Sequence, residues 1–156
     1  MPPIFYEQQS GEMRKMVKNV AIVSLSSGII GEQFVQFEVE IGLRRLKEYG
    51  LNVKLMPNAC KGLEYVKAHP EKRAEDLLAA FRDPEIDMIL CAIGGDDTYR
   101  MLPYLFENNE LAEAVSNKIF LGFSDTTVCY PPSACYLCSI QVILKLLGPA
   151  GMPELS

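Results

Sequence analysis

The chain has 156 residues, of which 49% are apolar and 22% are charged, and its formal net charge is -5. This length and composition are typical of one globular domain with a real hydrophobic core. The acidic balance argues against nucleic acid as a partner, because phosphate binding needs a basic surface. No stretch reaches the roughly 20 apolar residues of a membrane span. Residues 1–15 lack the pattern of a secretory signal, so we expect a cytoplasmic location without membrane contact.

Residues 1–18 are expected to form an irregular or partly helical lead-in, and residues 19–128 an α/β domain. Four short apolar runs predict its buried strands, at 19–25, 53–56, 88–93 and 119–123. Helical spacing lies between them, at 33–49, 71–81 and from Thr98 onward. Gly50 is expected to end the first helix and Pro70 to lie in the first turn of the second, whereas Pro103 should interrupt the third. The apolar residues predicted near one face of the first helix are Phe34, Phe37, Ile41 and Leu46.

Strands that alternate with helices at this spacing predict a parallel sheet with helices on both faces, as in flavodoxin-like and Rossmann-like domains. Ligands of such sheets bind at the carboxyl ends of the strands. The loops at 26–31, 94–98 and 124–127 all follow predicted strands. We therefore expect these three loops to converge on one crevice.

The loop at 94–98 carries most of the functional information. Two glycines, Gly94 and Gly95, follow the third strand; Asp96, Asp97 and the hydroxyl residue Thr98 come next, at the start of a helical pattern. A strand, tight turn and helix in this order can hold a nucleophilic oxygen beside backbone N–H groups, which suits acyl transfer. A well-capped turn without catalytic function explains the same spacing equally well. The two acids would repel a phosphate and so argue against a nucleotide-binding glycine loop.

Thr98 needs a base before it can act as a nucleophile. His69 is the only histidine, and its polar surroundings before a proline predict a solvated loop residue. Ser124 and Asp125, after the fourth strand, are expected either to bind a substrate and contact the corner or to cap the next helix. Ser26 and its neighbours offer a weak anion-nest signal.

No metal and no cofactor are expected. The five cysteines are predicted to be free thiols, since Cys135 and Cys138 have redox or metal-type spacing but no second pair accompanies them. Residues 129–156 form an apolar tail in which the stretch 134–147 is apolar on nearly all sides. We expect this tail to be covered by another subunit, to be poorly ordered, or to be an unnatural continuation of the domain.

Four segments together resemble the LD-carboxypeptidases and the microcin C immunity peptidases called MccF. They are 23–27 (VSLSS), 73–77 (RAEDL), 92–105 (AIGGDDTYRMLPYL) and 122–127 (GFSDTT). The resemblance runs from about residue 20 to 128 and implies an LD-carboxypeptidase N-terminal domain. The implied enzyme is a serine peptidase with a Ser-Glu-His triad that releases a C-terminal residue from murein peptides or cleaves aminoacyl-nucleotide antibiotics. It also implies a homodimer without a metal.

The resemblance places the family's serine on Thr98 and its oxyanion donors on the backbone around Gly95 and Tyr99. The residues it suggests for substrate binding are Gly94, Asp96, Asp97, Ser124 and Asp125. Two departures stand out: the nucleophile position is a threonine, and the family's glutamate and histidine belong to a C-terminal domain that this sequence does not contain. A truncated or frame-shifted reading of a longer gene would explain the change of composition at residue 129.

We therefore expect little or no activity from the chain alone. A non-catalytic module that binds a peptide or an aminoacyl-nucleotide is the alternative, and a small flavodoxin-like signalling or cofactor domain is a third interpretation.

Overall fold

The computed structural model describes residues 5–6, 15–115 and 118–129, with side chains from Met16 to Thr126 within these ranges. Residues 130–156 lie outside the described residues, and with them the predictions for the apolar tail and for Cys135 and Cys138. None of the helices in the described ranges has the length and apolar character needed to cross a membrane.

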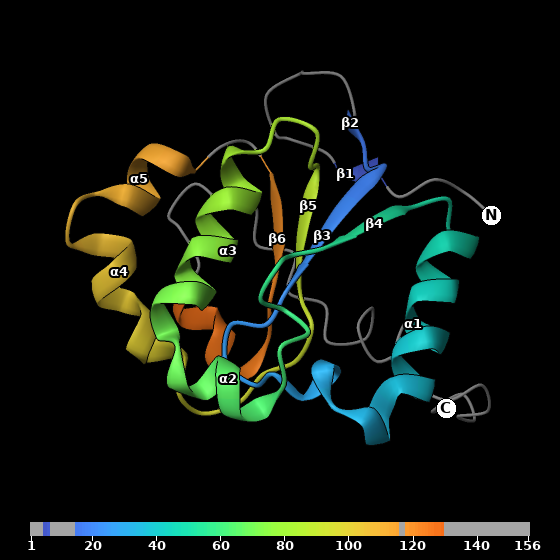
Figure 1. Cartoon of the computed structure of the whole chain (residues 1–156). Helices are drawn as coiled ribbons and strands as arrows, with labels where there is room; N and C mark the ends of the chain where they lie inside the picture. Colours follow the sequence, from blue (N-terminus) through green and yellow to red (C-terminus); the bar gives the residue numbers. More distant parts are fainter. Residues whose placement is uncertain (1–4, 7–14, 116–117, 130–156) are drawn as a thin grey trace, which may run out of the picture.

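The centre of the fold is a parallel sheet of four strands in the order β4-β3-β5-β6 (Figure 1). Its strands are β3 (Asn19–Val23), β4 (Asn52–Leu55), β5 (Met88–Cys91) and β6 (Ile119–Leu121). In this register, Ala21 lies between Lys54 of β4 and Ile89 of β5. Two further strands, β1 (Phe5–Tyr6) and β2 (Lys15–Met16), form a separate antiparallel pair.

Helices cover both faces of the sheet, as predicted. On one face lies α1 (Gln36–Glu48), which is preceded by the short 3₁₀ turns η1 (Ile29–Gly31) and η2 (Gln33–Val35) (Figure 1). On the other lie α3 (Pro70–Arg82), α4 (Leu102–Phe106) and α5 (Glu110–Ala114), while α2 (Leu63–Ala68) leads into α3. Two further 3₁₀ segments are η3 (Thr98–Met101) and η4 (Ser124–Cys129).

Side chains of β3, β5 and β6 alternate between two cores, because successive residues of a strand point to opposite faces. Ala21 and Ile89 belong to the core that α3 covers with Leu77 and Phe81. Ile22 and its neighbours on the other face pack with Leu46 of α1. All four residues of β5 are buried, which accounts for the unbroken apolar run in its sequence.

The predicted helix boundaries agree closely with the structure. Pro70 is the first residue of α3, and the helix that starts at Thr98 stops at Met101 before α4 restarts with Pro103 in its first turn. Gly50 has a φ of +77° after α1, as a C-terminal glycine cap requires. The short helices α2 and α5 were not predicted.

The prediction for the buried face of the first helix is partly wrong. Phe34 and Phe37 are 70% and 71% exposed, while Leu46 is 2% exposed. Leu46 lies nine positions after Phe37, and at about 100° per residue the two therefore lie on opposite sides of an α-helix. The side of α1 that faces the sheet carries Val39, Leu43 and Leu46.

Candidate active site

Three loops meet at the carboxyl edge of the sheet, as predicted. They follow β3, β5 and β6 and contribute Ser26, Thr98 and Asp125. The strand order has a topological switch point beside β3, because β4 lies on one side of β3 whereas β5 and β6 lie on the other. Such a switch point separates the loops of adjacent strands and is the usual ligand-binding place in this class of fold.

Thr98 is completely buried in the corner, which we define as residues 94–98. Its hydroxyl donates a hydrogen bond to Asp125 Oδ2 at 2.6 Å, and its backbone N–H donates to the same oxygen at 3.1 Å. The structure thus brings together two of the predicted site residues, Thr98 and Asp125.

The carboxyl group of Asp125 is held in its ionised form. Burial raises its pKa, but the hydroxyls of Thr98 and Ser26 and the backbone N–H groups of Thr98 and Gly95 together outweigh burial and lower the pKa below its ordinary value. Asp125 Oδ2 therefore accepts two donors from one residue of the loop after β5, the hydroxyl and the backbone N–H of Thr98.

The two glycines of the corner permit close packing of neighbouring loops. A Cβ atom on Gly95 would lie 2.1 Å from Ser26 Oγ, and one on Gly94 would lie 2.9 Å from the Cβ of Ser124. Neither glycine is among the described residues with positive φ. Glycine is needed at these two positions because neighbouring loops approach closely, and not because the backbone is left-handed.

The sequence reasoning missed a buried ion pair at the base of the corner. Arg73 of α3 is 1% exposed, and its Nη1 donates to Asp97 Oδ1 at 2.8 Å and to the carbonyl oxygen of Leu25 at 2.9 Å. Asp97 Oδ1 also accepts the hydroxyl of Ser26 at 3.2 Å. The available signal was the position of Arg73 on α3: it precedes the buried Leu77 by four residues and so shares the buried face of the helix.

The remaining predicted residues lie at the edge of the corner. Asp96 is exposed, and its backbone N–H donates to Ser26 Oγ at 3.1 Å. Tyr99 is 62% exposed. Beside them is an open crevice of about 320 Å³, which is lined by Ser26, Ser27, Leu63, Glu64, Lys67, Gly95, Asp96 and Asp97. Gly95, Asp96 and Asp97 thus face a space large enough for part of a small ligand.

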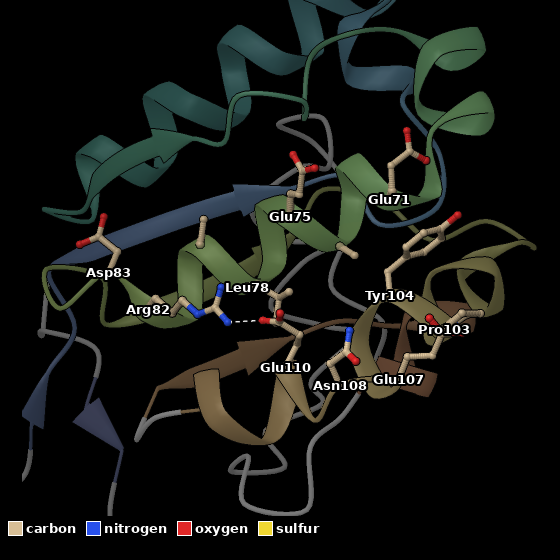
Figure 2. A pocket seen from close by; sticks show the side chains of 12 residues that line it. Glu71, Glu75, Leu78, Arg82, Asp83, Pro103, Tyr104, Glu107, Asn108 and Glu110 are labelled. Atoms are coloured by element: carbon tan, nitrogen blue, oxygen red, sulfur yellow. Dashed lines mark hydrogen bonds and ion pairs between the residues drawn. The ribbon is translucent and has the colours of Figure 1, made fainter.

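A larger, open hollow lies elsewhere, between α3 and the α4–α5 segment, and has a volume of about 680 Å³ (Figure 2). Its lining is rich in charged side chains, among them Glu75, Arg82 and Glu110, and Arg82 is paired with Glu110 across it. None of the predicted site residues lines this hollow. The smaller crevice beside the corner is therefore the candidate substrate site.

His69 lies away from this crevice, between α2 and α3. Its side chain is 43% exposed, and Nδ1 lies 2.8 Å from Glu71 Oε1. Its ring packs against Tyr65 with 4.4 Å between the ring centroids. These contacts agree with a solvated structural histidine, and none of the hydrogen bonds described for it connects it to Thr98.

Comparison with known proteins identifies the family. The family model of the LD-carboxypeptidase N-terminal domain matches residues 20–135. A putative carboxypeptidase from Streptomyces coelicolor is 34% identical over 121 residues, which cover 76% of this chain and 37% of that protein. A murein tetrapeptide carboxypeptidase from Pseudomonas aeruginosa is 30% identical over 109 residues, which cover 70% of this chain and 33% of that protein.

Solved structures show the same relationship. An MccF-like protein from Streptococcus pneumoniae, determined in complex with AMP, is 65% identical with a TM-score of 0.71, covering 72% of this chain and 33% of that chain. The chain thus spans about a third of the length of the relatives that it matches. The motifs at 92–105 and 122–127, the four-stranded parallel sheet and the family match agree, and the chain belongs to the LD-carboxypeptidase family through that family's N-terminal domain.

Proposed function

We propose that this chain supplies the nucleophile half of a serine-type carboxypeptidase site. Thr98 takes the nucleophile position, and the backbone N–H groups of Gly95 and Tyr99 take the place of oxyanion donors. Hydrolysis would release a C-terminal residue from a murein peptide or cleave an aminoacyl-nucleotide. The observation that carries the proposal is the place of the corner: it follows β5 at the switch point of the sheet and borders the crevice.

Substrate contacts in this proposal come from the polar groups around Thr98. Asp96 and Asp97 line the crevice, whereas Gly94 approaches Ser124, and Asp125 binds Thr98, outside its lining. The names of the relatives support a peptide substrate, since one is a murein tetrapeptide carboxypeptidase. The AMP complex of the S. pneumoniae protein supports a nucleotide-containing one.

The same proposal assigns little or no turnover to the chain by itself. Among the described residues, the only histidine, His69, is bound to Glu71. The Thr98 hydroxyl is hydrogen-bonded to the carboxylate of Asp125 and not to a neutral base. In the serine-hydrolase template, loss of triad members lowers the rate by orders of magnitude. The matched residues cover only about a third of these relatives, so a base and an orienting acid would come from the part of such a protein that this chain does not match.

A non-catalytic binding module is the second candidate, and one observation favours it. The hydroxyl of Thr98 has no exposed surface and donates to Asp125 at 2.6 Å, so it is not directed at the crevice as an attacking group. Such a module would bind a peptide or an aminoacyl-nucleotide without cutting it.

A chimera separates the two candidates. The chain is joined to the C-terminal part of the S. pneumoniae MccF-like protein, with Thr98, Thr98→Ser or Thr98→Ala at the corner. Release of the terminal residue from an L,D-tetrapeptide and cleavage of an aminoacyl-nucleotide are measured, and AMP binding is followed by calorimetry. Turnover by the serine variant and none by the alanine variant supports the peptidase. AMP binding that is equal in all three, with no turnover in any, supports the module.

Assembly and location complete the proposal. We place the full-length protein in the cytoplasm as a homodimer, on the resemblance to its family. Light scattering coupled to size exclusion tests the dimer, and a mass equal to one chain would exclude it.

A further inference from the structure

The carboxylate of Asp125 occupies the donors that an incoming substrate would need. Oδ2 accepts both the hydroxyl and the backbone N–H of Thr98, at 2.6 and 3.1 Å. The nearby Ser26 hydroxyl and the backbone N–H of Gly95 also lower the pKa of this carboxylate, against the effect of burial. A carbonyl oxygen placed against Gly95 and Thr98 would therefore compete with a negatively charged group that is part of the same chain.

The turn that carries Asp125 is built tightly against the corner. Ser124 has a φ of +56°, a left-handed conformation that few residues other than glycine adopt. Its Cβ would lie 2.9 Å from a Cβ on Gly94, so the turn and the corner are in direct contact only because residue 94 is a glycine.

Thr126 holds this turn in shape. Its hydroxyl donates to the carbonyl oxygen of Phe123 at 2.7 Å and accepts the N–H of Phe123 at 2.8 Å. The side chain of Thr126 is completely buried, as is that of Thr98. A strained residue between two fixed neighbours is a conformation that the surrounding structure must maintain.

We propose that the turn 124–126 is a latch that closes the corner, with Asp125 as an internal competitor for the donors around Thr98. In the closed state the Thr98 hydroxyl is turned away from the crevice and bonded to Asp125. Opening requires the turn to withdraw, which breaks both hydrogen bonds to Asp125 Oδ2 together. The inference rests on the proposed function, because it concerns the regulation of the same corner.

A thiol at position 98 measures the latch without any need for turnover. In the full chain Thr98→Cys is labelled with a small disulfide reagent, and each cysteine is quantified by peptide mass spectrometry. Exposed Cys60 and buried Cys91 serve as internal references within the same molecule. Rates are compared at the high-pH plateau, where the thiols are ionised, so that a difference reports access to the thiol.

The introduced thiol is expected to react at least about tenfold more slowly than Cys60, and Asp125→Ala is expected to raise its rate at least about tenfold, because a local opening equilibrium controls access. Asp125→Asn removes the charge with little change of shape. If circular dichroism shows that the alanine variant does not fold, the same tenfold rise in labelling rate is required of Asp125→Asn. Asp96→Asn is the matched control: it removes a neighbouring exposed charge and is expected to leave the rate unchanged.

Two results would overturn the latch. One is a rate for the introduced thiol equal to that of Cys60 with Asp125 in place, since the corner would then be open. The other is a rate that does not change when Asp125 is replaced. Neither depends on the chimera's turnover, so the latch and the proposed function fail by different measurements.

Discussion

Arg73 and Asp97 form an ion pair that fastens helix α3 to the corner, with 2.8 Å between Nη1 and Oδ1. The side chains of the pair are 1% and 15% exposed, and the same Nη1 atom also binds the carbonyl oxygen of Leu25. One guanidinium thus connects the loop after β3 with the loop after β5. Because Asp97 directly precedes Thr98, the backbone position of the proposed nucleophile depends on a side chain that α3 supplies.

Arg73→Met should strongly destabilise the domain. It removes the buried Arg73 donor from the Asp97 carboxylate and the Leu25 carbonyl, and leaves Asp97 with the half-exposed Arg100 at 3.6 Å. Removal of one member of a buried pair costs about 3–5 kcal/mol. The free energy of unfolding from urea titration measures the effect. Arg44→Met is the control: Arg44 and its partner Glu48 are 68% and 65% exposed, so its loss should cost less than about 1 kcal/mol. Equal midpoints for the two variants would contradict the structural role of Arg73.

Gly95→Ala should destabilise the domain by about 1–3 kcal/mol through overpacking. The added Cβ would lie 2.1 Å from Ser26 Oγ, and Ser26→Gly removes the atoms that it meets. The cost of the alanine should therefore be smaller when residue 26 is glycine, with a coupling energy of about 0.5–3 kcal/mol in a double-mutant cycle.

Gly50→Ala provides the contrast for this cycle. Its added Cβ meets no atom within 4 Å, but its φ is +77°. It should cost about 1–2 kcal/mol from backbone strain alone, and Ser26→Gly should not relieve that cost. Additive effects in both pairs would show that Gly95 and Ser26 do not collide.

Asp125 and Asp76 should change the pH dependence of stability in opposite directions. For Asp125, burial raises the pKa, but the hydrogen-bond donors of Thr98 and Ser26 lower it by more, so that the pKa lies below its ordinary value of 3.8. Its contribution is thus present above that value and is lost as the pH falls through the lower, folded-state pKa. For Asp76, burial is the main cause and raises the pKa despite hydrogen bonds from Asn58. Its ionised form is disfavoured by folding, so its contribution grows as the pH falls through the raised pKa.

Urea titrations between neutral and acid pH test these signs with Asp125→Asn and Asp76→Asn. On acidification, the parent chain should lose its advantage in free energy of unfolding over Asp125→Asn. Over the same pH range, its free energy of unfolding should rise relative to that of Asp76→Asn. Parallel curves for all three proteins would show that neither carboxyl titrates differently in the folded state.

The sequence was sufficient for those features that depend on local pattern. Apolar runs located the four strands, because a strand buried on both faces needs no alternation. Pro103 placed the break between η3 and α4 because proline lacks the N–H that a continuing helix requires. The short helices α2 and α5 have six and five residues, too few for a periodic pattern to be distinguished from a loop.

Long-range contacts in the site could not be read in the same way. The stretch around Arg73 is rich in charges, whereas its guanidinium is buried by loops that lie about 50 residues earlier and about 25 residues later in the sequence. The pairing of Thr98 with Asp125 likewise joins two loops separated by a helical crossover. The sequence assigns both loops to one edge of the sheet, but it does not predict the hydrogen bonds between them.

Leu46→Ala and Phe37→Ala test the corrected face of α1. Leu46 is 2% exposed and borders an apolar cavity of about 50 Å³ beneath the helix, so truncation enlarges an existing void. A loss of about 2–5 kcal/mol is expected, toward the upper end of that range. Phe37 is 71% exposed, and its truncation should change the free energy of unfolding by no more than about 0.5 kcal/mol. Urea titration at one pH measures both, and a larger loss for Phe37→Ala than for Leu46→Ala would mean that α1 presents its other face to the sheet.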